Sequence, residues 1–199
     1  MNVLLLGPAD SPLAPLVRAW GHDSVEWSAP VSPAWLDEHR IEFAISYRYR
    51  HIVPASVLAH LPNRIVNLHV SLLPWNRGAD PNLWSFLEST PKGVTIHYMD
   101  DGLDTGDIIC QEELAFPEAD ETLATTYARL SQAILRLFRL HGQGILTGAC
   151  ARRTQQGVGS AHRMRDKNPY LPLLTHGWNT PVRFLEGKAL PQASNHGNT

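Results

Sequence analysis

Cysteines and long apolar runs are scarce in this chain. Its 199 residues include only two cysteines, Cys110 and Cys150, which is too few for a disulfide framework. Neither lies in the Cys-x-x-Cys spacing of zinc or redox sites. No stretch approaches the roughly 20 apolar residues that a membrane-spanning helix needs, and the apolar run after Met1 is too short for a secretory signal. We therefore expect reduced cysteines, no membrane partner and a cytoplasmic location.

An excess of charge of either sign is also missing. Seventeen lysines and arginines against 19 acidic residues leave a formal charge of −2, and no basic stripe runs along the chain. A polyanion would find no general attraction, so we expect no nucleic-acid partner. The sequence has no repeats or low-complexity linkers, and 43% of its residues are hydrophobic. This composition is typical of one folded domain.

Short strand and helix patterns alternate along the first 150 residues. Val3–Leu6 is a continuous apolar run, typical of a buried parallel strand, and Asp10 or Ser11 could cap a following helix. Ser32 is expected to cap the next helix, with Pro33 in its first turn. We expect further strands at 24–27, 43–47, 64–68, 94–98 and 108–114, and further helices at 54–61, 81–89 and from 121, with Asp120 as the cap of the last. The pattern predicts an α/β fold with a doubly wound, mostly parallel sheet.

The helical periodicity fades after Gly148, and scattered prolines and glycines follow. We therefore predict a main domain at 1–150 and an irregular C-terminal segment at 151–199 that packs on it and whose end could be disordered. The chain could also form a homodimer, although the pattern indicates no particular face.

Two polar residues occupy the end of the strand predicted at 64–68. Alternation along a strand places Asn67 and His69 on one side and Leu68 on the other, at the edge of an open α/β sheet where functional residues gather. An amide beside an imidazole can donate hydrogen bonds to an oxygen that gains negative charge. Both residues are candidate catalytic groups, although such a pair can equally be structural.

Asp104 lies in the chain's densest turn signal, residues 100–107. A carboxylate there could keep His69 protonated and relay a proton through water. It could instead bond to the backbone of its own turn, or form a metal site with His69 and His97.

A longer series of residues is more specific than any of these alone. It consists of 67–74 (NLHVSLLP), Arg77-Gly78, 93–97 (GVTIH) and 101–106 (DGLDTG). This series resembles the folate-dependent formyltransferases, which include methionyl-tRNA, glycinamide ribonucleotide and sugar N-formyltransferases. The match covers roughly residues 1–148 in element order, and its motifs fall within 45–114. The resemblance implies a Rossmann-like formyltransferase fold with its catalytic domain at 1–150.

The resemblance also implies a reaction. An amine would attack the formyl group of 10-formyltetrahydrofolate, with Asn67 and His69 stabilising the oxyanion and Asp104 assisting proton transfer. No metal is expected. The cofactor-binding residues implied for the pterin pocket are Arg50, Ile52, Val53 and Leu58 on one wall and Met99, Asp100 and Leu103 on the other; the apolar ones could instead be core residues. His97 could bias the charge of the site or contact the acceptor, and Arg77 would contact the acceptor.

Departures from the motifs of individual family members reduce the range of possible acceptors. Glycinamide ribonucleotide formyltransferase holds a substrate phosphate in a Gly/Ser/Asn-rich loop, and residues 7–12 (GPADSP) occupy that place here. This acceptor is disfavoured, because two prolines remove hydrogen-bond donors and Asp10 adds a repelling charge. Methionyl-tRNA formyltransferase has a further C-terminal domain for which we expect no room here. We therefore expect a small-molecule amine, such as an amino sugar or a specialised metabolite.

Residues 157–181 could close over that acceptor through Arg163, Arg165 or Lys167, or could simply be a packing tail. Two other functions stay open. One is a 10-formyltetrahydrofolate hydrolase, although hydrolases usually have an extra N-terminal domain that we do not expect here. The other is a catalytically inactive folate-binding module.

Overall fold

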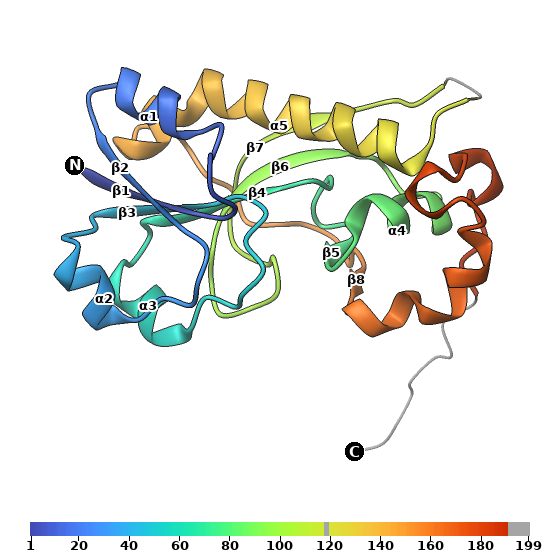
Figure 1. Cartoon of the computed structure of the whole chain (residues 1–199), viewed down its shortest axis with the longest axis horizontal. Helices are drawn as coiled ribbons and strands as arrows, with labels where there is room; N and C mark the ends of the chain where they lie inside the picture. Colours follow the sequence, from blue (N-terminus) through green and yellow to red (C-terminus); the bar gives the residue numbers. More distant parts are fainter. Residues whose placement is uncertain (118–119, 191–199) are drawn as a thin grey trace, which may run out of the picture.

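The computed structural model describes residues 1–117 and 120–190, and its centre is a six-stranded sheet (Figure 1). The strand order is β2-β1-β3-β4-β6-β7. The bounds are β1 (Asn2–Leu6), β2 (Asp23–Trp27), β3 (Phe43–Ser46), β4 (Ile65–His69), β6 (Gly93–Tyr98) and β7 (Ile108–Glu113). The first four strands in sequence pair in parallel, whereas β6 and β7 are antiparallel to their neighbours. The predicted α/β class with a mostly parallel sheet is confirmed.

Helices cover both faces of the sheet. α1 (Ala14–Ala19) and α5 (Leu123–Leu146) lie on one face, and α2 (Pro33–Glu38) and α3 (Ala55–His60) on the other (Figure 1). Ser32 caps α2 as expected, since its side chain accepts a hydrogen bond from the amide of Trp35. The expectation for α5 was wrong: Thr122 rather than Asp120 is the cap, in a reciprocal capping box with Thr125.

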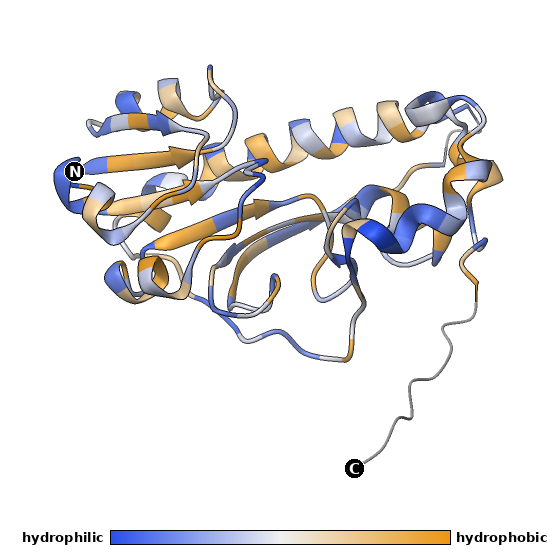
Figure 2. Cartoon of the chain, turned by 60° about the horizontal axis from the view of Figure 1, so that its bottom comes forward, coloured by the Kyte–Doolittle hydropathy of each residue, from blue (hydrophilic) through white to orange (hydrophobic). Residues whose placement is uncertain are grey.

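Two apolar layers fill the space between sheet and helices. One joins the sheet to α1 and α5 and includes Leu5, Ile45 and Phe138, while the other joins it to α2 and α3 and includes Leu36 and Val57. Figure 2 shows the central strands mainly in the hydrophobic colours, as expected for strands covered on both faces. The core thus fixes the edge of the sheet at which β3 and β4 end.

The segment after α5 packs on the domain through a third apolar cluster. This segment contains β8 (Ala161–His162) and three 3-10 helices, η1 (Met164–Leu173), η2 (Gly177–Asn179) and η3 (Val182–Phe184). Tyr170, Val182 and Leu185 pack against α4 (Pro81–Leu87). The expected disorder at the chain end concerns residues 191–199, which lie outside the described residues.

β8 also forms a two-stranded parallel sheet with β5 (Arg77–Gly78). Across residues 1–117 and 120–190, no helix has the length and apolar character to cross a membrane.

Candidate active site

Pairing of β4 with β6 brings the candidate polar residues together. In this antiparallel register Asn67 lies opposite His97, and His69 lies opposite Thr95. His97 is placed at an irregularity in the β6–β7 pairing. The side chains of Asn67, His69 and His97 therefore meet near the carboxyl end of β4, where the sequence predicted a site.

The loop between β6 and β7 turns the side chain of Asp104 toward this point. Its backbone has a φ of 52°, in the left-handed region that few residues other than glycine adopt. The carboxylate of Asp100 closes the loop from within, because it accepts hydrogen bonds from the Gly102 amide (3.1 Å) and the Thr105 hydroxyl (2.7 Å). At Gly106 a Cβ atom would lie 1.9 Å from the carbonyl oxygen of Tyr98, so only glycine fits there.

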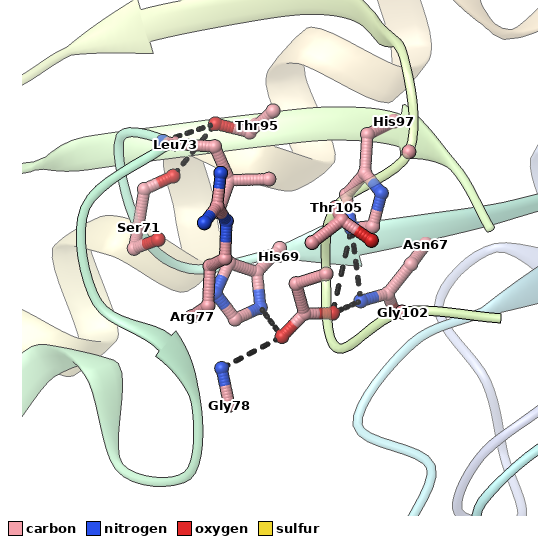
Figure 3. A network of polar contacts seen from close by, with 12 residues as sticks. Asn67, His69, Ser71, Leu73, Arg77, Gly78, Thr95, His97, Gly102 and Thr105 are labelled. Atoms are coloured by element: carbon pink, nitrogen blue, oxygen red, sulfur yellow. Dashed lines mark hydrogen bonds and ion pairs between the residues drawn. The ribbon is translucent and has the colours of Figure 1, made fainter. Parts of the chain in front are cut away.

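Four groups surround the Asp104 carboxylate. It accepts hydrogen bonds from Asn67 Nδ2 (3.2 Å) and from the Gly78 amide (2.8 Å) (Figure 3). His69 Nδ1 lies 3.7 Å from its Oδ2, and His97 Nε2 lies 3.6 Å from its Oδ1. The predicted catalytic residues and His97 thus form one contiguous cluster.

The environment of Asp104 favours its ionised form. Burial by itself would raise the pKa of this carboxyl, but the neighbouring His69 and His97 rings and the hydrogen bond from the Gly78 amide together hold its pKa well below the usual range. The donors Asn67 and Gly78 act on the carboxylate whatever the protonation of the histidines. Asp104 is accordingly negative near neutral pH.

His69 behaves differently from what its pairing with Asp104 predicts. Burial lowers the pKa of its imidazole below the ordinary value, and this outweighs the opposite effect of the Asp104 charge. The expectation that Asp104 keeps His69 protonated was therefore wrong. In the folded chain the imidazole is neutral near pH 7.

Backbone carbonyls fix the hydrogen positions on both histidines. His69 Nε2 lies 3.3 Å from the Asn76 carbonyl oxygen, and His97 Nδ1 lies 2.7 Å from that of Tyr98. A carbonyl only accepts, so these nitrogens carry a hydrogen, and in the neutral ring of His69 the bare Nδ1 faces Asp104. A proton released at this site would find an acceptor nitrogen beside a carboxylate.

The loop after β4 is held by the neighbouring strands. The Thr95 hydroxyl donates to the Ser71 carbonyl (2.7 Å) and accepts from the Leu73 amide (3.1 Å). The Gln111 side chain donates to the Leu73 carbonyl (2.8 Å), and the following Leu73–Pro74 peptide bond is cis. These contacts hold the loop that connects His69 to Arg77 and Gly78, and so help to place Gly78 beside Asp104.

The residues expected to line a pterin pocket differ in exposure. Val53, Leu58 and Met99 belong to the apolar cluster under α2 and α3. Ile52 and Leu103 are apolar side chains that face solvent, with exposed fractions of 91% and 53%. Arg50 is exposed, and the Asp100 carboxylate is used within its own loop. The Leu103 side chain lies beside Gly78, where a Cβ would be only 2.8 Å from it, so this apolar group borders the catalytic cluster.

Arg77 pairs with a residue that the sequence analysis did not single out. Its Nε and Nη2 donate to Gln155 Oε1 at 3.2 and 2.8 Å. A single glutamine in an irregular segment has no pattern that would reveal this role. Of the three cations in the 157–181 segment, Lys167 pairs with Asp80 at 2.7 Å, whereas Arg163 and Arg165 are exposed.

No set of three or more histidines, cysteines, aspartates or glutamates suited to a metal ion occurs within residues 1–117 and 120–190. That the site works without a metal stays a prediction.

Comparisons with known proteins point to one family. The model of the formyl transferase family matches residues 21–138. A solved formyltransferase, PseJ from Anoxybacillus kamchatkensis, crystallised with UDP-4,6-dideoxy-4-formamido-L-AltNAc and tetrahydrofolate, is 44% identical with a TM-score of 0.91. The alignment covers 96% of this chain and 100% of that one.

Other relatives are longer. A dTDP-4-amino-4,6-dideoxyglucose formyltransferase of Mycobacterium bovis is 32% identical over 64% of this chain and 53% of its own length. A methionyl-tRNA formyltransferase of Syntrophus aciditrophicus is 44% identical over 46% of this chain and 31% of its own length. The chain thus spans about a third to a half of these curated relatives. With most of its sheet, the first part of helix α5 and the whole Asn67–His69–Asp104 cluster inside the matched residues, the chain belongs to the formyl transferase family.

Proposed function

We propose that the chain transfers a formyl group from 10-formyltetrahydrofolate to a primary amine of a nucleotide-linked sugar. The observation that carries this proposal is the cluster of Asn67, His69 and His97 around the Asp104 carboxylate. The likeness to PseJ over nearly the full length of both chains supports it.

The acceptor class follows from what two relatives are named for. The PseJ complex contains a UDP-linked sugar with a formamido group at C4, and the mycobacterial relative acts on a dTDP-linked 4-amino sugar. Both are 4,6-dideoxy sugars on a nucleoside diphosphate. We propose a 4-amino-4,6-dideoxy sugar of this kind for the present chain.

The reaction moves one acyl group and one proton. The amine nitrogen attacks the formyl carbon, the carbonyl oxygen gains negative charge, and the carbon–N10 bond of the folate then breaks. The amine loses a proton and N10 gains one, which leaves a formamide and tetrahydrofolate. The amide nitrogen of Asn67 donates to Asp104 Oδ1 (3.2 Å) and lies 3.4 Å from His97 Nε2, and it would donate to the oxyanion in place of this longer contact with His97.

Proton transfer falls to His69 and Asp104. Neutral His69 can take the proton at Nδ1, and the carboxylate 3.7 Å away stabilises the imidazolium that results. Once protonated, that nitrogen becomes a second donor for the oxyanion. Asp104 thereby assists proton transfer, and His97 faces the same carboxylate from the other side.

The donor site is proposed between the chain before α3 and the β6–β7 loop. Ile52 and Leu103 expose apolar surface that a flat pterin ring would cover. Buried Val53 and partly buried Leu58 and Met99, in the apolar cluster under α2 and α3, would line the site as well, with Arg50 and Asp100 at its rim. Arg77 and His97 are proposed acceptor contacts.

Tetrahydrofolate release, followed by absorbance, tests the proposal. Purified chain receives 10-formyltetrahydrofolate with UDP- or dTDP-linked 4-amino-4,6-dideoxy sugars, glycinamide ribonucleotide or no amine. Release that requires a nucleotide-linked amino sugar is expected. Release without any amine would identify a hydrolase instead, and folate binding without release under every condition would identify a binding module.

Several finer points stay predictions: the Rossmann-like description of the fold, the division at residue 150, the cytoplasmic location, a homodimer and the absence of a nucleic-acid partner.

A further inference from the structure

The side chain of Gln155 connects two parts of the active site. Its Nε2 donates to the carbonyl oxygens of Asp104 (2.8 Å) and Gly106 (2.9 Å), and its Oε1 accepts the two hydrogen bonds from Arg77. Both amide hydrogens and both oxygen lone pairs are therefore used. An amide saturated in this way holds its partners in one relative geometry.

Neighbouring backbone contacts place Gln155 beside the loop. Arg153 and Ile108 exchange backbone hydrogen bonds in both directions, at 2.8 and 2.9 Å. This bridge lays residues 153–155 along the end of the β6–β7 loop. Backbone pairing two residues away thus holds Gln155 beside the loop, within reach of its side chain.

Each of the two contacts bears on the same carboxylate. Asp104 has the left-handed backbone described above, so its side-chain direction depends on what holds its peptide groups. Arg77 precedes Gly78, whose amide donates to Asp104 Oδ2. Gln155 thus fixes the peptide that carries the carboxylate and the strand that carries one of its donors.

We propose that Gln155 is a positioning residue of the transfer reaction. It contacts no reacting atom; it holds the Asp104 loop against β5 and so sets how the carboxylate faces His69 and His97. A neutral amide also leaves Arg77 without an acidic partner among the residues that the structure describes, so its charge is available to an anionic acceptor. The inference rests on the proposed function.

Three variants separate these effects. Gln155→Ala removes all four hydrogen bonds. Gln155→Glu keeps the acceptor for Arg77 but replaces the donor by an oxygen that faces two carbonyls. Gln156→Ala is the matched control, because this neighbouring glutamine is exposed. In the tetrahydrofolate-release assay of the full-length protein with donor and amino-sugar acceptor, we expect kcat to fall about 10- to 100-fold in both Gln155 variants and to stay unchanged in the control.

A double variant distinguishes positioning from a merely structural role. If Gln155 acts through Asp104, Gln155→Ala combined with Asp104→Asn should be no slower than Asp104→Asn alone, within about twofold. Multiplied losses in the double variant, or an unchanged kcat in Gln155→Ala, would overturn the inference while leaving the proposed function intact.

A readout without turnover keeps the two questions apart. NMR titration of the ring signals of His69 reports how Asp104 faces this ring, whether or not the chain is active. We expect the titration curve of His69 to shift in Gln155→Ala and not in Gln156→Ala. If wild type releases no tetrahydrofolate with any amine, the proposed function fails and this titration still decides the role of Gln155. If Gln155→Ala does not fold, Gln155→Met, of similar length, takes its place in both experiments.

Discussion

At the scale of single residues, the site is organised around one carboxylate. Asp104 lies on a loop, yet it accepts hydrogen bonds from a strand side chain and from a backbone amide of β5. The two histidines that face it, His69 and His97, are each fixed by a backbone carbonyl. Small displacements of this one side chain therefore change the surroundings of both rings.

Replacing Asp104 with asparagine should remove the charge with little change in shape. We expect kcat/KM for the amino-sugar acceptor to fall about 10²- to 10⁴-fold, the usual size of a lost acid–base contribution, while donor binding is kept. Tetrahydrofolate release measures the first and fluorescence titration the second. Asp101→Asn in the same loop is the control, since this carboxylate is exposed; equal losses in both variants would contradict the assignment.

His69 should also make stability depend on pH. Its pKa is lowered in the folded chain, whereas in the unfolded chain it lies near the ordinary value of about 6.5. As the pH falls through and below about 6.5, the unfolded chain binds a proton that the folded chain does not, so the free energy of unfolding decreases. Asp104 contributes in the same direction only below about pH 4, because its folded pKa is depressed.

Urea unfolding at several pH values between 5 and 7.5 checks this sign. The free energy of unfolding should fall more steeply toward acid in wild type than in His69→Gln. His51→Gln, at an exposed histidine, should keep the wild-type slope. A slope that His69→Gln leaves unchanged would show that His69 is not the buried neutral group.

At the scale of elements, the sequence correctly predicted those helix caps and strands that depend on residues close together in the chain. Ser32 before Pro33 correctly predicted the cap of α2, and the apolar runs correctly predicted the strands of the sheet. The strand ending at His69 was placed correctly because polar residues interrupt an apolar run there.

Contacts between residues far apart in the sequence could not be predicted in the same way. Apolar alternation does not state whether β6 and β7 run parallel or antiparallel, so the opposition of Asn67 and His97 depends on a register that only the fold supplies. Asp120 was a reasonable cap by residue type, but the reciprocal bonds of Thr122 and Thr125 determine where α5 begins. The role of Gln155 could not be predicted, because its three partner residues, which share four hydrogen bonds with it, lie 49 to 78 residues away in the sequence.

The loop before α3 offers a test of the donor site. Ile52→Ser removes an apolar side chain that contributes little to the core, given its 91% exposure. If the pterin covers it, KM for 10-formyltetrahydrofolate should rise about tenfold with kcat nearly unchanged, as expected for the loss of one buried aliphatic group. Leu140→Ser on α5, at a leucine that is also exposed (76%), should change neither constant.

At the scale of the whole molecule, the segment after α5 is part of the packed structure. Backbone amides of Gly187 and Ala189 donate to the carbonyls of Phe86 and Leu87 at the end of α4, and Leu185 is fully buried against the same helix. The segment and the sheet should therefore unfold together.

Leu185→Ala tests this coupling. We expect the free energy of unfolding to fall by about 2–5 kcal/mol in a single transition, with hydrogen exchange in β1, β3 and β4 accelerated as well. Leu190→Ala, at an exposed position (62%), should cost less than about 0.5 kcal/mol. An early transition confined to residues 151–190, with protection of the sheet unchanged, would contradict a common unfolding unit.

The contacts of residues 153–162 with the β4 and β6 loops also bear on how the molecule is made. All strands of the main sheet and helix α5 leave the ribosome before Gln155, which reaches back 51 residues to Asp104, and before Ser160, which reaches back 84 residues to Asn76. All strands of the sheet can thus have been synthesised while the Asp104 carboxylate still lacks its support. A nascent chain would acquire catalytic competence only after Gln155 and Ser160 have also been synthesised and have packed against these loops.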